Sequence, residues 1–212
     1  ISGLVGSEMC IRDSYNTLTH FIGLILSLIG MPILIYFDRG LTDLSLFSII
    51  FFCAGLICVY ASSTLYHYNT NPKISHKLRV FDHISIFYLI CGSYAPVCLI
   101  TLYNGIGLNI FISVFIISIA GTLFKVFYTG KYERASLFLY LAMGWLIVID
   151  IQSVLKLIDF YGIILLVLSG LFYSVGTFFY SMKKMKFSHS IWHVFVLLGS
   201  ACHYFVILLF VI

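Results

Sequence analysis

The fold is decided by residues 17–36, which have the sequence TLTHFIGLILSLIGMPILIY. No Asp, Glu, Lys or Arg interrupts this run. A helix needs about 20 predominantly apolar residues to cross the hydrocarbon core of a bilayer, and the run has that length. It is therefore predicted to be a transmembrane helix.

The rest of the chain has the same apolar character. Of its 212 residues, 61% are hydrophobic and 9% are charged, whereas about a quarter of the residues in a soluble domain are charged. The mean hydropathy of +1.08 extends over the whole length, which excludes a soluble domain with a single anchor. Transmembrane β-strands would alternate apolar and polar residues, and these continuous apolar runs do not. We therefore predict an all-α integral membrane protein.

Seven apolar runs are predicted to form a bundle of seven transmembrane helices. They are residues 17–36, 44–66, 83–102, 108–127, 136–149, 161–180 and 192–212. At about 20 residues each, the helices use most of the chain and leave no room for a separate extramembrane domain. We expect residues 15–212 to form one transmembrane domain. Residues 1–14 are expected to be a non-native N-terminal segment, non-helical over residues 1–13, to which no function is assigned.

The basic residues predict the orientation of the bundle, because Lys and Arg are retained on the cytoplasmic side. Ten of them fall on one side and two on the other, which places the N-terminus in the cytoplasm and the C-terminus outside. The net charge of +4 is then a topological signal, and it gives no support to nucleic-acid binding. The two groups are Arg12, Lys73, Lys77, Arg79, Lys125, Lys131, Arg134, Lys183, Lys184 and Lys186, against Arg39 and Lys156.

The cysteines and the general composition add two expectations. Six Cys residues are scattered along the chain without a Cys-x-x-Cys pair, so no thiolate metal site or redox motif is predicted. The composition is compatible with a protein of a bacterial cytoplasmic (inner) membrane. The lipid bilayer is the expected partner, and the oligomeric state is left open.

Polar residues gather at the predicted cytoplasmic end of the bundle. Ser63 and His67 lie one turn apart where the second helix ends, and Asp82 opens the third helix. His189 and His193 precede and open the seventh helix, and their i, i+4 spacing places both imidazoles on one helix face. Ionisable groups in or beside membrane helices are expensive, so they are functional candidates by default.

Three imidazoles in one place are suited to zinc. Neutral imidazole is a common zinc ligand, and three protein ligands with a water molecule make an open, catalytic type of site. His67, His189 and His193 are the candidate ligands, Asp82 would orient or deprotonate the water, and Ser63 would hydrogen-bond to the water or to a carbonyl group. The alternative is that these histidines are interfacial anchors or packing residues.

The remaining histidines are assigned other roles. His20 is expected to be a polar inward contact rather than a ligand, and His83 an interfacial neighbour of Asp82. His203 lies ten residues beyond His193, about 15 Å deeper along a helix, which is too far to share an ion with it. We expect His203 to line a cavity or to bond another helix.

Several motifs together resemble the haemolysin III family and its relatives, the progestin and adiponectin receptors and alkaline ceramidases. In order along the chain, they are NTLTH (16–20) with Gly23, STLYH (63–67), LRVFDH (78–83), GSYAP (92–96), LYLAMGW (139–145), and HSIWH (189–193) followed by His203. The resemblance covers nearly the whole chain from Tyr15 onward. It departs at the start, where family members usually carry acidic residues and this chain has IRDS (11–14).

The resemblance implies a seven-helix bundle with Zn²⁺ held at His67, His189 and His193, with Asp82 binding through the water and Ser63 nearby. It also implies a function, which we expect to be zinc-dependent hydrolysis of a lipid amide or ester, of the ceramidase-like kind. The alternatives are a non-enzymatic receptor or stress sensor with a structural zinc ion, and the cytolytic pore-former of the family name. A cavity that connects the metal to lipid or water would favour the hydrolase, and a sealed ion would favour the receptor.

Overall fold

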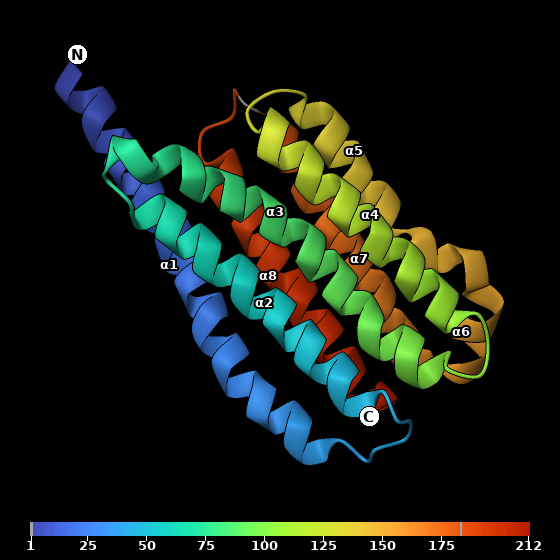
Figure 1. The fold of residues 1–212 in the computed structure, drawn as a ribbon. Helices are drawn as coiled ribbons and strands as arrows, with labels where there is room; N and C mark the ends of the chain where they lie inside the picture. Colours follow the sequence, from blue (N-terminus) through green and yellow to red (C-terminus); the bar gives the residue numbers. More distant parts are fainter. Residues whose placement is uncertain (1, 183) are drawn as a thin grey trace.

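The computed structural model describes residues 2–182 and 184–212, with side chains from residue 13 onward, and no strand occurs in this part of the chain (Figure 1). Seven of its helical spans are long and apolar enough to cross a membrane, as predicted. The elements are α1 (Ser2–Phe37), α2 (Ser45–Tyr68), α3 (Pro72–Pro96), η1 (Val97–Thr101), α4 (Gly107–Tyr128), α5 (Glu133–Gly144), η2 (Leu146–Asp150), α6 (Ile151–Leu157), α7 (Phe160–Ser181), α8 (Ser188–Val206) and η3 (Ile207–Val211).

The helices form one elongated bundle with the two termini at opposite ends (Figure 1). α2 packs extensively against both α1 and α3, and α8 packs against α7 and α1. The fifth span, made of α5, η2 and α6, contacts its neighbours much more sparsely. The sparse packing of the fifth span leaves space inside the bundle, on the side of α3 and α8 that faces α5 and α7.

Close contact between α2 and α3 sets the relative height of the two helices. Gly55 lies against the backbone of α3, where a Cβ atom would be 2.7 Å from the carbonyl oxygen of Tyr88. Nearer the N-terminal end of the bundle, the hydroxyl group of Ser62 donates a hydrogen bond of 2.9 Å to that of Ser85. Small residues of this kind let helix backbones approach closely in a membrane.

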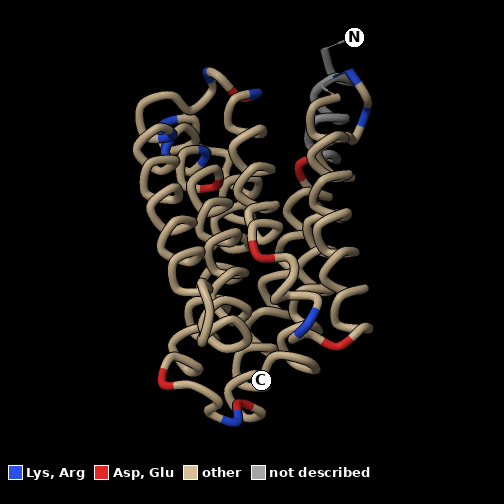
Figure 2. Tube along the Cα trace, turned by 90° about the vertical axis from the view of Figure 1, so that its right-hand side faces the viewer, with Lys and Arg blue, Asp and Glu red and all other residues tan. Residues whose placement is uncertain are grey.

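Most Lys and Arg residues lie at the end of the bundle that also holds the N-terminus, and we call it the basic end (Figure 2). The junctions between α2 and α3, α4 and α5, and α7 and α8 lie there. Lys183, which was predicted to belong to this group, lies outside the described residues. The grouping follows the predicted pattern, and the cytoplasmic location of this end remains a prediction.

Two predicted boundaries are wrong at the basic end. α3 begins at Pro72, not at residue 83, so the segment that contains Lys73 and Arg79 is helical and not a loop. Asn71 caps this helix, because its side chain accepts a hydrogen bond from the backbone N–H of Lys73, and proline is well suited to the first helical position. α1 begins at Ser2, so the expectation of a non-helical segment over residues 1–13 is also wrong.

The fifth span is interrupted, whereas one continuous helix over residues 136–149 was predicted. α5 ends at Gly144, a 3₁₀ segment follows, and α6 then continues to Leu157. The cause is Tyr94 of α3, whose hydroxyl group donates to the carbonyl oxygen of Met143 at 2.8 Å and accepts from the N–H of Ile147 at 2.9 Å. A side chain inserted into the backbone ladder in this way bends a helix.

Candidate metal centre

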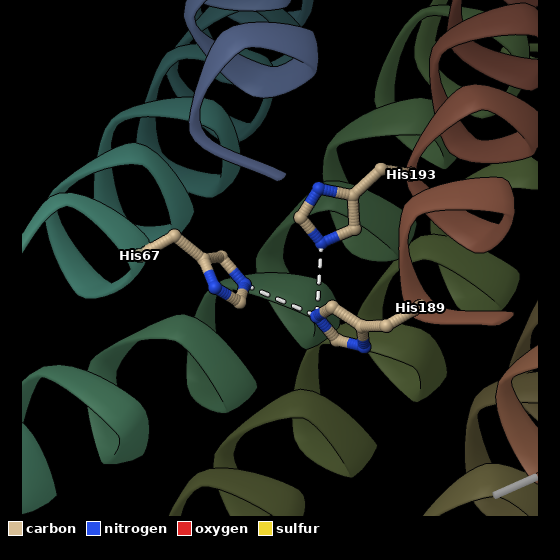
Figure 3. Close-up of side chains that lie close together, drawn as sticks. All are labelled: His67, His189 and His193. Atoms are coloured by element: carbon tan, nitrogen blue, oxygen red, sulfur yellow. Dashed lines mark hydrogen bonds between the residues drawn. The ribbon is translucent and has the colours of Figure 1, made fainter. Parts of the chain in front are cut away.

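Three histidines from two helices meet at the basic end of the bundle (Figure 3). His67 lies in the last turn of α2, while His189 and His193 lie on successive turns of α8. The Nε2 atom of His189 is 3.0 Å from Nε2 of His193 and 3.1 Å from Nε2 of His67. One nitrogen from each ring lies within 4.8 Å of the other two.

These distances suit a metal ion. With zinc–nitrogen bonds of about 2.0–2.1 Å, neighbouring ligand nitrogens in a tetrahedral site lie about 3.3 Å apart. The site is also largely shielded from solvent, because the side chain of His67 is 7% exposed and His193 is fully buried. Two of the three nitrogen–nitrogen distances, 3.0 and 3.1 Å, are therefore close to those expected for imidazoles that share one zinc ion.

The hydrogen-bonding state of His193 supports the same conclusion. Its Nδ1 atom lies 3.2 Å from the carbonyl oxygen of Asn16, which can only accept, so Nδ1 carries the proton and Nε2 presents a lone pair. His189 Nε2 could donate one proton to His193 or to His67, but a single proton serves two such contacts poorly. A cation among the three nitrogens would satisfy all of them.

A narrow cavity extends from this cluster along the inside of the bundle. Its volume is about 190 Å³. The lining is mainly apolar and comes chiefly from α3, the fifth span, α7 and α8, with single residues from α2 and η1. His189 and Asp82 line it near the basic end, and Val154 of α6 lines it near the opposite end. The cavity thus connects His189, the one cluster histidine among its lining residues, to the apolar interior of the bundle.

One side of this cavity lies towards the surface of the bundle. Trp145, Val148 and Val167 all line the cavity, yet between 45% and 49% of their surface is exposed. These residues belong to the interrupted fifth span and to α7, which pack sparsely on each other. The gap between these two spans therefore faces the region that lipid would occupy.

The two residues predicted to take part in catalysis are both buried near the cluster. Asp82 of α3 is 5% exposed and contributes to the cavity wall. Ser63 of α2 is fully buried one turn before His67, and its hydroxyl group interacts with the carboxyl group of Asp82. The two predicted residues are therefore neighbours beside the histidine cluster.

Two further histidines have the roles expected of them. His203 lines the cavity, and its Nε2 atom donates to the carbonyl oxygen of Ser93 at 2.8 Å. His20 is 1% exposed and stacks on the ring of His193, with the ring centroids 3.6 Å apart. Neither residue belongs to the group of three nitrogens.

A buried charged cluster beside the site was not predicted. Glu133, the first residue of α5, lies 3.1 Å from Nζ of Lys125 and 3.3 Å from the guanidinium group of Arg79. Lys125 is completely buried in α4, although its charge was counted with the loops. His83 was expected to be an interfacial neighbour of Asp82, but it is 7% exposed and its Nδ1 atom faces Glu133 at 3.6 Å. The feature of the sequence that could have indicated this cluster is Glu133, the one acidic residue between the fourth and fifth apolar runs.

The seven apolar spans and the three converging imidazoles place the chain in a class of integral membrane proteins with a cluster of histidines inside a helical bundle. Residues 9–204 match the family model described as haemolysin-III related. The chain therefore belongs to the haemolysin III family, as the motifs indicated.

Similarity to individual proteins agrees with this assignment. The chain is 37% identical over 196 residues to the hemolysin-3 homolog of Bacillus subtilis (strain 168), covering 92% of each protein. It is 35% identical over 198 residues to hemolysin-3 of Bacillus cereus, covering 93% of this chain and 90% of the relative. It is 30% identical over 159 residues to the human monocyte to macrophage differentiation factor, covering 72% of this chain and 66% of the relative. The human relative supports the relation to the progestin and adiponectin receptors.

Proposed function

We propose that this protein is a zinc-dependent hydrolase that cleaves an amide or ester bond of a lipid within the membrane. The observation that carries the proposal is the cavity, which extends from His189 and Asp82 into the apolar interior of the bundle. A pocket that is mainly apolar with a few convergent polar groups at one end suits a ligand with a polar head and an acyl tail.

The three histidines would hold the ion, with Nε2 of each ring as the ligand atom. When bound, zinc would polarise a carbonyl oxygen and make water a better nucleophile near neutral pH. Zinc bound by three protein ligands keeps a fourth position open, which is typical of catalytic and not of structural sites. Because the cavity reaches His189, this open position would be accessible to substrate.

Asp82 and Ser63 would carry out the proton transfer and stabilise the developing charge. In the proposed reaction water adds to the carbonyl carbon, and the bond from that carbon to the amide nitrogen or ester oxygen breaks. Asp82 takes a proton from the water and returns it to the leaving amine or alcohol. The buried hydroxyl group of Ser63, next to Asp82, would donate a hydrogen bond to the carbonyl oxygen as it becomes negative.

The small volume and apolar lining of the cavity suit a single acyl chain of a lipid better than a complete lipid molecule. Its lining residues run along the inside of the bundle from His189 to Val154. The acyl chain would enter through the gap between the fifth span and α7, where Val148 and Val167 are half exposed. The scissile group would then lie at the basic end, at the level of Asp82, and the leaving headgroup would exit on that side.

Metal analysis combined with a lipid-hydrolysis screen tests this proposal. We expect detergent-purified protein to retain about one zinc ion, and His67→Ala, His189→Ala and His193→Ala to lose both the zinc and the hydrolysis of ceramide or phospholipid analogues. His76→Ala is the matched control, because His76 is exposed on α3 and lies outside the cluster. Protein stripped of metal that still hydrolyses these lipids at the full rate would refute the proposal.

A further inference from the structure

The first helix contacts the backs of two of the three candidate ligands. Asp13, Asn16, Thr19 and His20 are spaced three, three and one residue apart, so they form one stripe along α1. This stripe faces α2 and α8 at the height of the histidine cluster. None of these four residues has a role in the proposed reaction.

The contact with His67 is made by a carboxylate. Oδ1 of Asp13 lies 3.8 Å from Nδ1 of His67, the ring nitrogen that points away from the cluster. The Asp13 side chain is 40% exposed, and that of His67 is 7% exposed. At this distance the contact is electrostatic and not a hydrogen bond, and a negative charge beside the outer nitrogen favours a proton on that nitrogen and leaves the inner nitrogen free to bind a metal.

The contact with His193 is made by a backbone carbonyl group and a hydroxyl group. Nδ1 of His193 lies 3.2 Å from the carbonyl oxygen of Asn16 and 3.3 Å from Oγ1 of Thr19. The Thr19 hydroxyl proton is directed to backbone carbonyl oxygens of α1, including that of Asn16 at 3.0 Å, which leaves an oxygen lone pair for His193. Both contacts therefore fix the proton of His193 on Nδ1.

Two further contacts hold α1 and α8 in register around His193. The hydroxyl group of Ser190 donates a hydrogen bond of 2.5 Å to Oδ1 of Asn16. The ring of His20 lies almost parallel to that of His193, at an angle of 14°. Neither ring nitrogen of His20 forms a hydrogen bond to any described residue, so the ring contributes a flat contact that limits rotation of the His193 ring.

We propose that α1 is the outer coordination shell of the metal centre, with Asp13, Asn16 and Thr19 as positioning residues and His20 as a packing support for His193. This inference rests on the proposed metal site, because it concerns ligands of that site. Outer-shell partners of this kind typically change metal affinity by about 10–100-fold when they are removed. The expected role is therefore in metal retention and ligand orientation, and not in contact with the substrate.

Zinc affinity measured by chelator competition on purified full-length protein tests the role of Asp13 and Thr19. Asp13→Asn and Thr19→Val should each weaken zinc binding by about 10–100-fold. Asp13→Glu should restore most of the lost affinity, since it keeps the carboxylate. The matched controls are Asp43→Asn at the opposite end of the bundle and Thr122→Val in α4, whose hydroxyl group donates to the carbonyl oxygen of Ser118 in its own helix. Both should bind zinc as the wild type does.

A second measurement separates positioning from general stability. The visible absorption of the Co²⁺-substituted protein reports the ligand geometry, and we expect His20→Ala to alter it while His20→Phe, which keeps a flat ring, preserves it. Thermal unfolding of the metal-free Asp13→Asn and Thr19→Val proteins should match that of the metal-free wild type. Wild-type protein that binds no zinc would overturn the metal site itself. Zinc binding by the wild type with equal affinity in Asp13→Asn and Thr19→Val would overturn only the role of α1.

Discussion

Replacing Glu133 by Gln should destabilise the bundle strongly. Its carboxylate is held by Lys125 at 3.1 Å, Arg79 at 3.3 Å and the backbone N–H of Gly130 at 3.0 Å. Lys125 has no exposed surface, so the substitution leaves its ammonium group buried without a counter-charge. Removing one partner of a buried ion pair costs about 3–5 kcal/mol, and because the Glu133 side chain is 12% exposed we expect about 3 kcal/mol.

A double-mutant cycle measures this cost and isolates its cause. The free energy of unfolding would be determined in detergent for Glu133→Gln, Lys125→Met and the double variant. Because Lys125→Met removes the charge and keeps an unbranched apolar side chain, the double variant should be more stable than Glu133→Gln alone. Lys131→Met, at an exposed position in the same connection, should change stability by at most about 0.5 kcal/mol. A loss below about 1 kcal/mol for Glu133→Gln, or simple additivity of the two changes, would refute the reasoning.

Three other substitutions have defined outcomes. Asp82→Asn should leave zinc content unchanged and lower lipid hydrolysis by about 10²–10⁴-fold, measured by metal analysis beside a rate assay, and full activity would exclude Asp82 as the base. Tyr94→Phe removes the hydroxyl group that forms hydrogen bonds on both sides of the break in the fifth span. It should lower the free energy of unfolding by about 1–3 kcal/mol in a denaturant titration, whereas Tyr103→Phe, at an exposed position, should not. Gly55→Leu should separate α2 from α3 and lower the melting temperature, whereas the same change at Gly144, which has open space around it, should not.

The fold was predictable to the extent that each helix is specified by its own residues. Long apolar runs cannot satisfy their backbone hydrogen bonds in lipid except as helices, so their number and order follow from composition. The break in the fifth span was not predictable, because it depends on a hydroxyl group supplied by Tyr94, about fifty residues earlier in the chain. The start of α3 could have been found from Asn71 and Pro72, which together form a standard helix start.

The candidate site was predictable only where it depends on local spacing or on the distribution of basic residues. The i, i+4 spacing of His189 and His193 is local, and the alternation of basic segments brought His67 to the same end of the bundle. The prediction of orientation, however, assumes that every Lys lies in a solvated loop. It therefore gave no indication that Lys125 is buried and paired with Glu133. The contacts from Asp13 and Asn16 were hidden because they depend on the rotation of α1 about its axis, which apolar runs do not specify.

The order of the ligand-bearing helices along the chain has a consequence for biosynthesis. The candidate ligands lie on α2 and α8, and His67 and His189 are 122 residues apart in the sequence. During synthesis, α2 therefore enters the membrane with one imidazole well before α8 supplies the other two. An ion bound at the proposed site would then enter only after α8 has docked against the earlier spans, and it would tie together two helices that are distant in the sequence.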